Sequence, residues 1–355
     1  MAIWLNRERV SGSRLMPGSF FVQPDNIELM PLTTRVLTIL ADGDFHSGTA
    51  IGHALEVSRA AVCKAVKILT ESGLHIARHA GRGYRLDSRF IPLNKDIIIN
   101  QIGSAEAAAQ LGEILLLDRV DSTNRYLLDI ARDVALPCVC LAETQQAGRG
   151  RLGRHWVTTG YSNILLSLSW YFPGGINAIA GLSLAAGVGV IRALREYGIP
   201  DVGLKWPNDI LWQGRKLAGL LVDIRAEAQA PALAVVGLGL NMFVAPQDAV
   251  QIDQPWVDIC TILAAPGERN RMSGLLIRHL LRVMSEFERG GFETVKPEWE
   301  QYDVFYHKPV RLVRAHEQWL GVAQGVDIQG ALVIEDQQGQ LRRFYSGEIS
   351  MRLAS

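Results

Sequence analysis

The sequence predicts an α+β protein of three domains: a winged helix-turn-helix domain, a central mixed β-sheet with helices, and a small C-terminal β-barrel. Helical spacing of apolar residues near the N-terminus gives way to a Gly/Arg-rich hairpin. Buried-type strands then alternate with amphipathic helices, and short alternating strands close the chain. The predicted boundaries are an extension, expected to be disordered, at 1–30, followed by domains at 31–92, 93–300 and 301–355.

Composition describes an ordinary globular protein. Of 355 residues, 48% are hydrophobic and 20% charged, and the formal net charge is +0. A nucleic-acid surface, if present, must therefore be local. No apolar run in the sequence reaches membrane-spanning length, so we expect no membrane partner. The four cysteines form no CxxC pair and are interpreted as reduced residues of a cytoplasmic protein, and those at 138 and 140 share one face of a strand.

The first thirty residues mix arginine, glutamate, glycine and proline, with no apolar core that would mark a secretory signal. Patterned sequence begins near Met30, so we expect the extension either to be disordered or to arise from an upstream start codon, with Met30 as the working start.

The next segment predicts helix, turn and helix. Apolar residues at helical spacing fill 34–40, Ser47 is placed to cap a second helix over 48–55, and a short turn leads to a third helix from Arg59. The hairpin at 76–86 follows as a wing.

Positive charge concentrates in this module. Between Ser58 and Arg89 there are seven Lys/Arg against two acids, which suits phosphate contact. The alternative is a winged helix used only for protein contact. A single module would grip DNA weakly, so DNA binding implies a dimer on a two-fold site. The candidate DNA-binding residues are Ser58, Arg59, Lys64, Lys67 and Arg82.

A loop of alternating glycine and arginine lies between two apolar strands at residues 145–156, reading Gln-Gln-Ala-Gly-Arg-Gly-Arg-Leu-Gly-Arg-His-Trp. Glycine lets backbone approach a ligand, and arginine provides planar charged forks for carboxylate or phosphate. The alternative is a solvated basic loop. The apolar flanks favour a phosphate-handling element.

Two further polar clusters stand at strand ends. Asp-Ser-Thr-Asn at 121–124 is either a helix cap or a small polar socket. Lys-Trp-Pro-Asn-Asp at 205–209 fixes a lysine, an amide and a carboxylate together, where a plain turn is the alternative. Lys216 follows a Gly-Arg turn. The strand ending at Asn241 carries Gly-Leu-Gly, where a flat ligand is expected to lie against backbone.

Other nucleotide sites are excluded. The sequence has neither a P-loop nor a complete GxGxxG.

After residue 309, turns near 327–330 and 337–340 separate short strands, which predicts a barrel of about five strands.

The ordered blocks resemble the biotin–protein ligases. They are the Gly/Arg loop, Asp121–Asn124, Lys205–Asp209, Arg215–Gly219, Gly237–Asn241 and Gly347–Ser350. With the N-terminal module, the chain is similar to the bifunctional form that is both ligase and biotin-operon repressor. The resemblance implies a class II synthetase-like central sheet and an SH3-like barrel. It implies MgATP-dependent formation of biotinyl-5′-AMP, then transfer to a lysine of the biotin carboxyl carrier protein of acetyl-CoA carboxylase. The adenylate would act as corepressor, with an adenylate-bound homodimer on the biotin operator.

The resemblance also implies residue roles. Catalysis falls to Arg151, Arg154, Lys205 and Lys216. Biotin binding falls to Ser122, Thr123, Asn124, Gln145, Gly148, Arg149, Gly150, Arg151, Lys216, Gly237 and Gly239. ATP binding falls to Arg151, Arg154, Trp156, Lys205, Asn208, Asp209, Lys216 and Asn241, with Mg²⁺ near Asn208 and Asp209.

Three alternatives remain open. A lipoate–protein ligase is disfavoured because its Arg-Arg-x-Ser-Gly-Gly-Gly run is absent. A repressor without catalysis is disfavoured by the intact lysines and Asp209. A ligase whose winged helix binds no DNA is not excluded by sequence.

Overall fold

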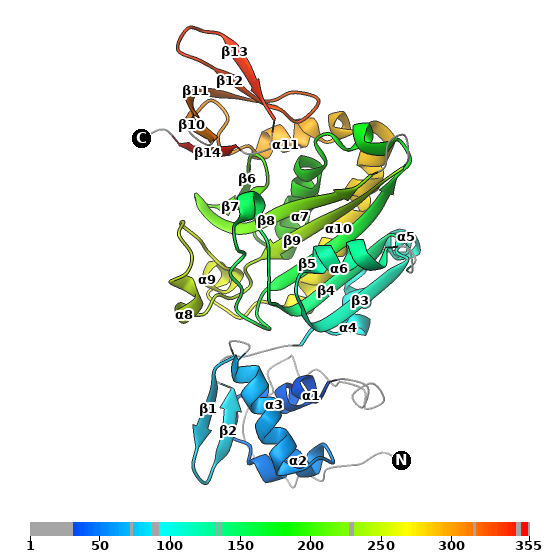
Figure 1. Ribbon diagram of the computed structural model, residues 1–355, viewed down its shortest axis with the longest axis vertical. Coiled ribbons are helices and arrows are strands. Elements are labelled where there is room, and N and C mark those ends of the chain that lie inside the picture. The colour runs from blue at the N-terminus through cyan, green and yellow to red at the C-terminus, as the bar shows by residue number, and fades with distance from the viewer. Residues whose placement is uncertain are drawn as a thin grey trace.

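The computed structural model describes residues 31–71, 74–86, 92–131, 134, 136–226, 231–314, 317–345 and 349–353. The predicted extension at 1–30 lies outside these residues, as do Asp87, Arg89, Gly347 and Glu348. Three bodies follow one another along the long axis, with the central sheet between the winged helix and the C-terminal strands (Figure 1).

The N-terminal body confirms the predicted helix-turn-helix and wing. Its elements are α1 (Leu32–Leu40), α2 (Gly48–Ala54), α3 (Arg59–Glu71), β1 (Ile76–His79) and β2 (Gly83–Leu86). The hydroxyl of Ser47 accepts from Ala50 N at 3.0 Å, as a helix cap should. Val62, Val66 and Leu69 of α3 are fully buried, so the apolar stripe holds the third helix against the other two.

The central body contains a seven-stranded mixed sheet, ordered β3-β4-β5-β9-β8-β7-β6. Only the β3–β4 pair is parallel. The strands are β3 (Glu113–Val120), β4 (Cys138–Gln145), β5 (Ile164–Phe172), β6 (Val202–Lys205), β7 (Asp209–Trp212), β8 (Arg215–Arg225) and β9 (Ala232–Leu240).

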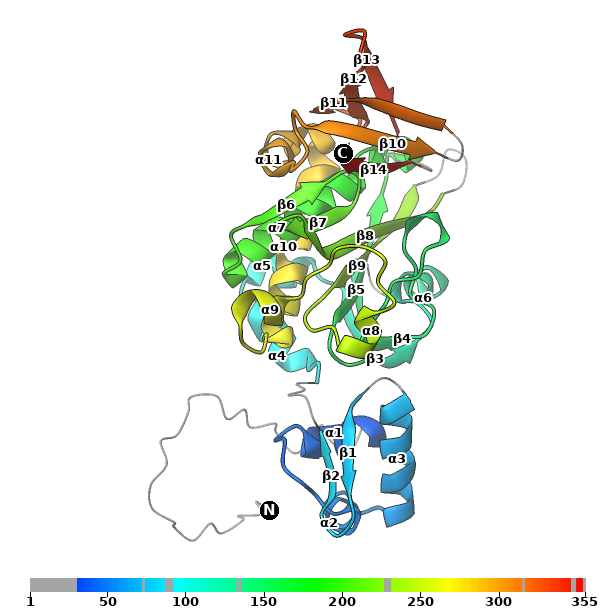
Figure 2. The same cartoon turned by 90° about the vertical axis from the view of Figure 1, so that its left-hand side faces the viewer.

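Helices cover the two faces of this sheet unequally. On one face α6 (Thr123–Ile130) stands alone, while α7 (Leu182–Tyr197) and α10 (Arg269–Gly290) cover the other (Figure 2). Side chains along β4 point alternately to these two faces. Val139 and Leu141 join the large core under α10, whereas Cys138 and Cys140 face α6. The shared face predicted for these two cysteines is confirmed, and burial raises their pKa values to about 11 and about 12.

Smaller elements complete the central body. They are α4 (Lys95–Ile102), α5 (Ala105–Gln110), α8 (Pro246–Ala249), α9 (Ile259–Leu263), α11 (Lys296–Tyr302) and the 3₁₀ turns Arg151–Gly153, Gly175–Ile179 and Phe292–Thr294. The segment Gly175–Tyr197 is long and apolar enough to cross a membrane, but most of it is buried inside this body. It is interpreted as a core segment.

Five antiparallel strands form the C-terminal sheet, ordered β13-β12-β11-β10-β14. They are β10 (Pro309–Arg314), β11 (Glu317–Val326), β12 (Leu332–Glu335), β13 (Leu341–Phe344) and β14 (Ser350–Leu353). The strand number agrees with the prediction. Trp206 Nε1 donates to Gly330 O at 3.1 Å, and Val304 N donates to Leu204 O at 3.0 Å, so this sheet is tied to the edge strand β6.

Candidate functional site

A cavity of about 690 Å³ opens where the Gly/Arg loop crosses β7, β8 and β9. Its walls come from the loop, the segment 251–256 and the C-terminal residues Ile349 and Met351. All predicted biotin and ATP residues line it except Gly148, whose carbonyl accepts from Trp156 N at 3.0 Å inside the loop. The lining residues among them are Ser122, Thr123, Asn124, Gln145, Arg149, Gly150, Arg151, Arg154, Trp156, Lys205, Asn208, Asp209, Lys216, Gly237, Gly239 and Asn241.

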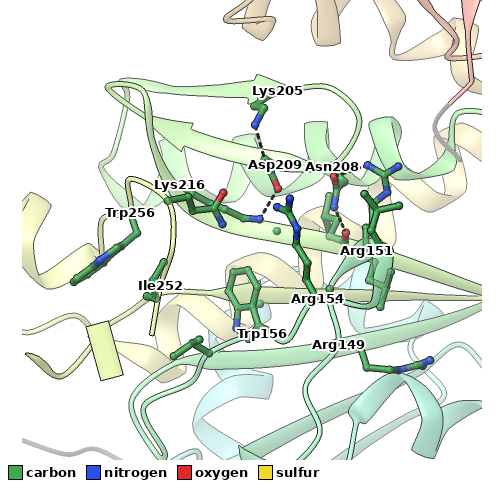
Figure 3. A pocket seen from close by; sticks show the side chains of 18 of the residues that line it. Arg149, Arg151, Arg154, Trp156, Lys205, Asn208, Asp209, Lys216, Ile252 and Trp256 are labelled. Carbon is green, nitrogen blue, oxygen red and sulfur yellow. Dashed lines mark hydrogen bonds and ion pairs between the residues drawn. The ribbon is translucent and has the colours of Figure 1, made fainter. Parts of the chain in front are cut away.

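Cations converge on one carboxylate in this cavity. Lys216 Nζ lies 2.7 Å and Lys205 Nζ 3.5 Å from the carboxylate oxygens of Asp209 (Figure 3). Arg151 donates to Asn208 Oδ1 at 3.3 Å from the opposite wall. Each of these side chains stands at a strand end or on the loop, so the sheet edge positions them together. The arrangement is suited to an anion carrying several charges.

Burial disfavours the charged forms of two of these groups. Desolvation lowers the pKa of Lys205, helped by the neighbouring Lys216 and opposed by Asp209. Desolvation likewise lowers the pKa of Arg151, opposed by Asp209 and helped by Arg154. An anion entering the cavity would stabilise both charged forms. A negatively charged ligand would therefore suit this part of the cavity.

The oxygen donors suggested for a metal already have cationic partners. Asp209 pairs with two lysines, and Asn208 Oδ1 accepts from Arg151. Within the described residues, no group of three or more His, Cys, Asp or Glu side chains could hold a metal ion. The geometry is that of a carboxylate ordering two lysines, and it does not form a metal site of its own.

Trp156 explains the glycines of β9 and β8. A Cβ on Gly239 would lie 2.4 Å from Trp156 Cε2, and one on Gly219 would lie 3.1 Å from the same ring. Lys216 Nζ lies 5.4 Å from the ring centroid on a cation–π contact. The flat group against these strands is thus the indole of the chain itself, where the sequence suggested space for a ligand. Asn241, also at this end, donates from its amide to Val257 O at 3.2 Å.

Another part of the cavity wall is a polar socket beside α6. Ser167 Oγ lies 2.7 Å from Thr123 Oγ1 and 2.6 Å from Asn124 Oδ1. Gln145 Oε1 accepts from the backbone and hydroxyl of Thr123 at 2.8 and 3.1 Å. A Cβ on Gly237 would lie 2.1 Å from Asn124 Oδ1, so this glycine is required for the amide to reach the sheet. Ser167, Thr123, Asn124 and Gln145 thus hold one another in fixed directions at the cavity wall.

Sequence reasoning missed Ser167 and Asp223. Ser167 is fully buried on β5, and Asp223 Oδ2 accepts from Asn124 Nδ2 and Arg149 Nη2, each at 2.9 Å. A polar residue within an apolar strand was the available signal for Ser167. Asp223 offered none, because its partners stand 74 and 99 residues away.

The predicted DNA-binding residues occupy two places on the N-terminal body. Ser58 Oγ accepts from Ala61 N at 3.1 Å and so caps α3, whereas Lys67 lies 3.7 Å from Glu71 on its exposed side. Arg59 and Lys64 are exposed on the same helix. On the wing, Arg82 stacks 4.3 Å from the ring centroid of Phe45. Arg85 stacks on that ring too, at 4.8 Å, so the wing presents two ordered guanidinium groups.

Comparisons with known proteins agree with this architecture. The Biotin/lipoate A/B protein ligase family matches residues 116–241, an HTH domain matches residues 33–85, and the Biotin protein ligase C terminal domain matches residues 308–352.

Relatives of this chain match it over most of its length. The chain is 36% identical to the Bifunctional ligase/repressor BirA of Escherichia coli (strain K12), over 90% of this chain and 97% of the relative. It is 29% identical to the protein of the same name from Bacillus subtilis (strain 168), over 88% and 95%. The biotin protein ligase of Aquifex aeolicus, solved with biotin and ATP, superposes with a TM-score of 0.58 at 23% identity, covering 68% of this chain and 99% of that one. The chain therefore belongs to the family of bifunctional biotin ligase/repressors, as a biotin–protein ligase that carries an N-terminal helix-turn-helix repressor domain.

Proposed function

We propose that the cavity joins biotin to the α-phosphate of ATP, with the cations around Asp209 as the group that drives the step. The observation that carries this is their position: Lys216, Lys205 and Arg151 line the same cavity as the polar socket and Trp156. A ligand with a polar ring at one end and a carboxylate at the other would place that carboxylate among the cations. A nucleotide would reach the same point from the other side.

Biotin's ureido ring fits the polar socket. Its carbonyl and two N–H groups need polar partners held in fixed directions, and Thr123, Gln145 and Asn124 are held so by their hydrogen bonds to one another and to Leu221 O. Ser122, Arg149 and Gly150 line the same end. Gly148 supports the loop conformation behind them.

The first step is adenylation. A biotin carboxylate oxygen attacks the α-phosphorus of ATP, the bond to pyrophosphate breaks, and biotinyl-5′-AMP remains. Arg151, Arg154, Lys205 and Lys216 neutralise the charge that builds on the phosphate oxygens, so catalysis is electrostatic and positional. Trp156 and Asn241 line the nucleotide end. Mg²⁺ belongs to the proposal as the counter-ion of the triphosphate and would be held mainly by phosphate oxygens; Asn208 and Asp209 would reach it only by giving up their contacts with Arg151 and the two lysines.

The second step consumes the adenylate. The neutral ε-amine of a lysine on the biotin carboxyl carrier protein attacks the acyl carbon, AMP leaves, and the amine proton passes to solvent.

The proposed DNA ligand follows from the relatives, whose names give both ligase and repressor. We propose the biotin operator as the DNA ligand of α3 and the wing, with an adenylate-bound homodimer spanning its two halves. ATP and the carboxylase subunit imply a cytoplasmic protein.

The experiment follows both products in one reaction. Purified protein, biotin, MgATP and apo carrier domain are mixed, and the carrier is examined by mass spectrometry after proteolysis. The proposal expects one biotinyl group on one lysine, with AMP and pyrophosphate formed in equal amounts. Lys216→Met, which removes the charge at similar length, should abolish both products. Full transfer by that variant contradicts the assignment.

A further inference from the structure

Asp223 joins the Gly/Arg loop to the polar socket. It lies on β8, outside every motif of the sequence, and one of its oxygens accepts from both Asn124 and Arg149 at 2.9 Å. Asn124 is 3% exposed, whereas the Arg149 side chain is 49% exposed. The carboxylate therefore connects a fixed buried amide to an arginine at the surface.

The contacts of Asp223 complete a closed ring of hydrogen bonds. Starting from Gln145 at the head of the loop, the ring passes through Thr123, Ser167 and Asn124. It continues through Asp223 to Arg149, four residues along the same loop. Both ends of the segment 145–149 are thus tied to one buried cluster. Removing Asp223 opens the ring on the side of Arg149 and leaves the Gln145 side intact.

A loop that covers a reactive adenylate must be held closed by contacts that can also break. Biotin and ATP must enter, and the mixed anhydride must then be kept from water until the carrier arrives. A buried ion pair would hold the loop too firmly, but a pair with one exposed partner is weak and is screened by salt. The pair between Asp223 and Arg149 has this character.

We propose that Asp223 is a positioning residue that fastens the Gly/Arg loop through Arg149 and so retains the acyl-adenylate between the two half-reactions. This inference rests on the proposed adenylation at the same site. Asp223 is not among the residues that line the 690 Å³ cavity, so it acts through Asn124 and Arg149 and does not touch the reacting atoms. It sets how long the loop stays closed.

The test is Asp223→Asn, which keeps an oxygen acceptor and removes the charge. Protein loaded with labelled biotin and ATP is chased with excess unlabelled biotin in the absence of carrier, and the label that stays bound is followed by rapid filtration. We expect the label to leave about five-fold faster than from the wild type at low salt, the size of effect that one exposed ion pair gives. Raising the ionic strength should bring the wild-type rate up to that of the variant and leave the variant's rate unchanged.

Three further variants separate a fastening from general damage. Asp129→Asn removes an exposed pair with Arg125, at 4.0 Å on α6, and should behave as wild type. Asp223→Glu restores the charge and should recover both retention and salt dependence. Adding Asp223→Asn to Arg149→Gln should not increase the rate of label release further, because both changes act on the same contact, the one between Asp223 and Arg149.

The proposal is overturned if Asp223→Asn retains label as the wild type does, or if its effect adds to that of Arg149→Gln. If Asp223→Asn does not fold, the rate of label release from Asp223→Glu is measured across a salt series instead. A rate that does not change with salt contradicts the proposed role of the Asp223–Arg149 pair. A wild-type protein that forms no adenylate would instead contradict the proposed function.

Discussion

The hydroxyl of Tyr161 donates a hydrogen bond of 2.8 Å to the carboxylate of Asp118 on β3. The ring of Tyr161 is fully buried within the apolar cluster of the winged helix, although the residue follows the Gly/Arg loop in sequence. Thr33 and Thr34, at the start of α1, lie 3.4 Å from the same carboxylate. Residues from the loop stem, the sheet edge and the repressor domain thus meet at one carboxylate.

Tyr161→Phe should weaken this junction. Burial and the neighbouring Asp118 carboxylate raise the pKa of Tyr161, so the hydroxyl remains a donor. Losing a hydrogen bond to a charged acceptor costs about 1.5–3 kcal/mol. Amides of α1 should therefore exchange faster with solvent in hydrogen-exchange measurements. The matched control is Tyr171→Phe, on an exposed side chain of β5, and equal exchange in the two variants would refute the role of the contact.

Arg151→Ala should reduce adenylate formation by about 10²–10³-fold, because one charge facing the developing phosphate oxygens is lost. The fold should survive, since Arg151 lies on the loop outside the core. Pyrophosphate–ATP exchange measures the step directly. Arg125→Ala, on an exposed face of α6, provides the control, and near-normal exchange by the Arg151 variant would remove it from the assignment.

Gly239→Ala should impair the nucleotide end of the cavity, because its Cβ would overlap the indole of Trp156 at 2.4 Å. We expect a raised KM for ATP with a smaller change for biotin. The double variant Gly239→Ala, Trp156→Phe has a smaller ring at the point of overlap and should recover part of the ATP affinity. No difference between single and double variants would show that the close approach is not what requires the glycine.

Asp303→Asn should stabilise the protein most at neutral pH. Burial raises the pKa of Asp303 from 3.8 to about 6, opposed by the backbone N–H of Phe305, and its buried Oδ2 atom has no hydrogen-bond partner among the described residues. The folded chain therefore holds a proton that the unfolded chain has lost, and the free energy of unfolding falls as pH rises through this interval. Because the residue is only partly buried, we expect a gain of about 1–2 kcal/mol near pH 7.5 and much less near pH 5 in urea titrations. A gain independent of pH would contradict this origin.

Arg82→Ala should weaken operator binding and lower the slope of log K against log salt by about one, as loss of one phosphate contact does. Phe45→Leu leaves the charge and removes the surface on which Arg82 and Arg85 stack, at 4.3 and 4.8 Å. It should weaken binding several-fold with little change in slope. Fluorescence anisotropy across a salt series measures both quantities, and an unchanged slope for Arg82→Ala would place that residue off the DNA.

Much of the fold could be predicted because local patterns carry it. Apolar spacing and Ser47 define α1 to α3, and turn residues separate the C-terminal strands. The order of the seven central strands could not, because pairing such as β5 with β9 depends on contacts far apart in sequence. The periodicity of apolar residues in the sequence does not show which strands pair.

The candidate site shows the same division. Charged motifs predicted the residues that line the cavity, since Lys205, Asp209 and Lys216 cannot be buried without partners. What the sequence could not supply was their pairing, or the fact that Trp156 and Asn124 occupy the space above Gly239 and Gly237. Asp118 and Asp223 stand in no motif, and only the folded chain brings them to Tyr161 and Arg149.

The most direct test of the central claim is pyrophosphate–ATP exchange with biotin and lipoate offered separately. The arrangement of socket, cations and indole predicts exchange that requires biotin, is lost in Lys216→Met, and is absent with lipoate. Exchange driven by lipoate, or none with biotin in the folded wild-type protein, would contradict the assignment of this cavity.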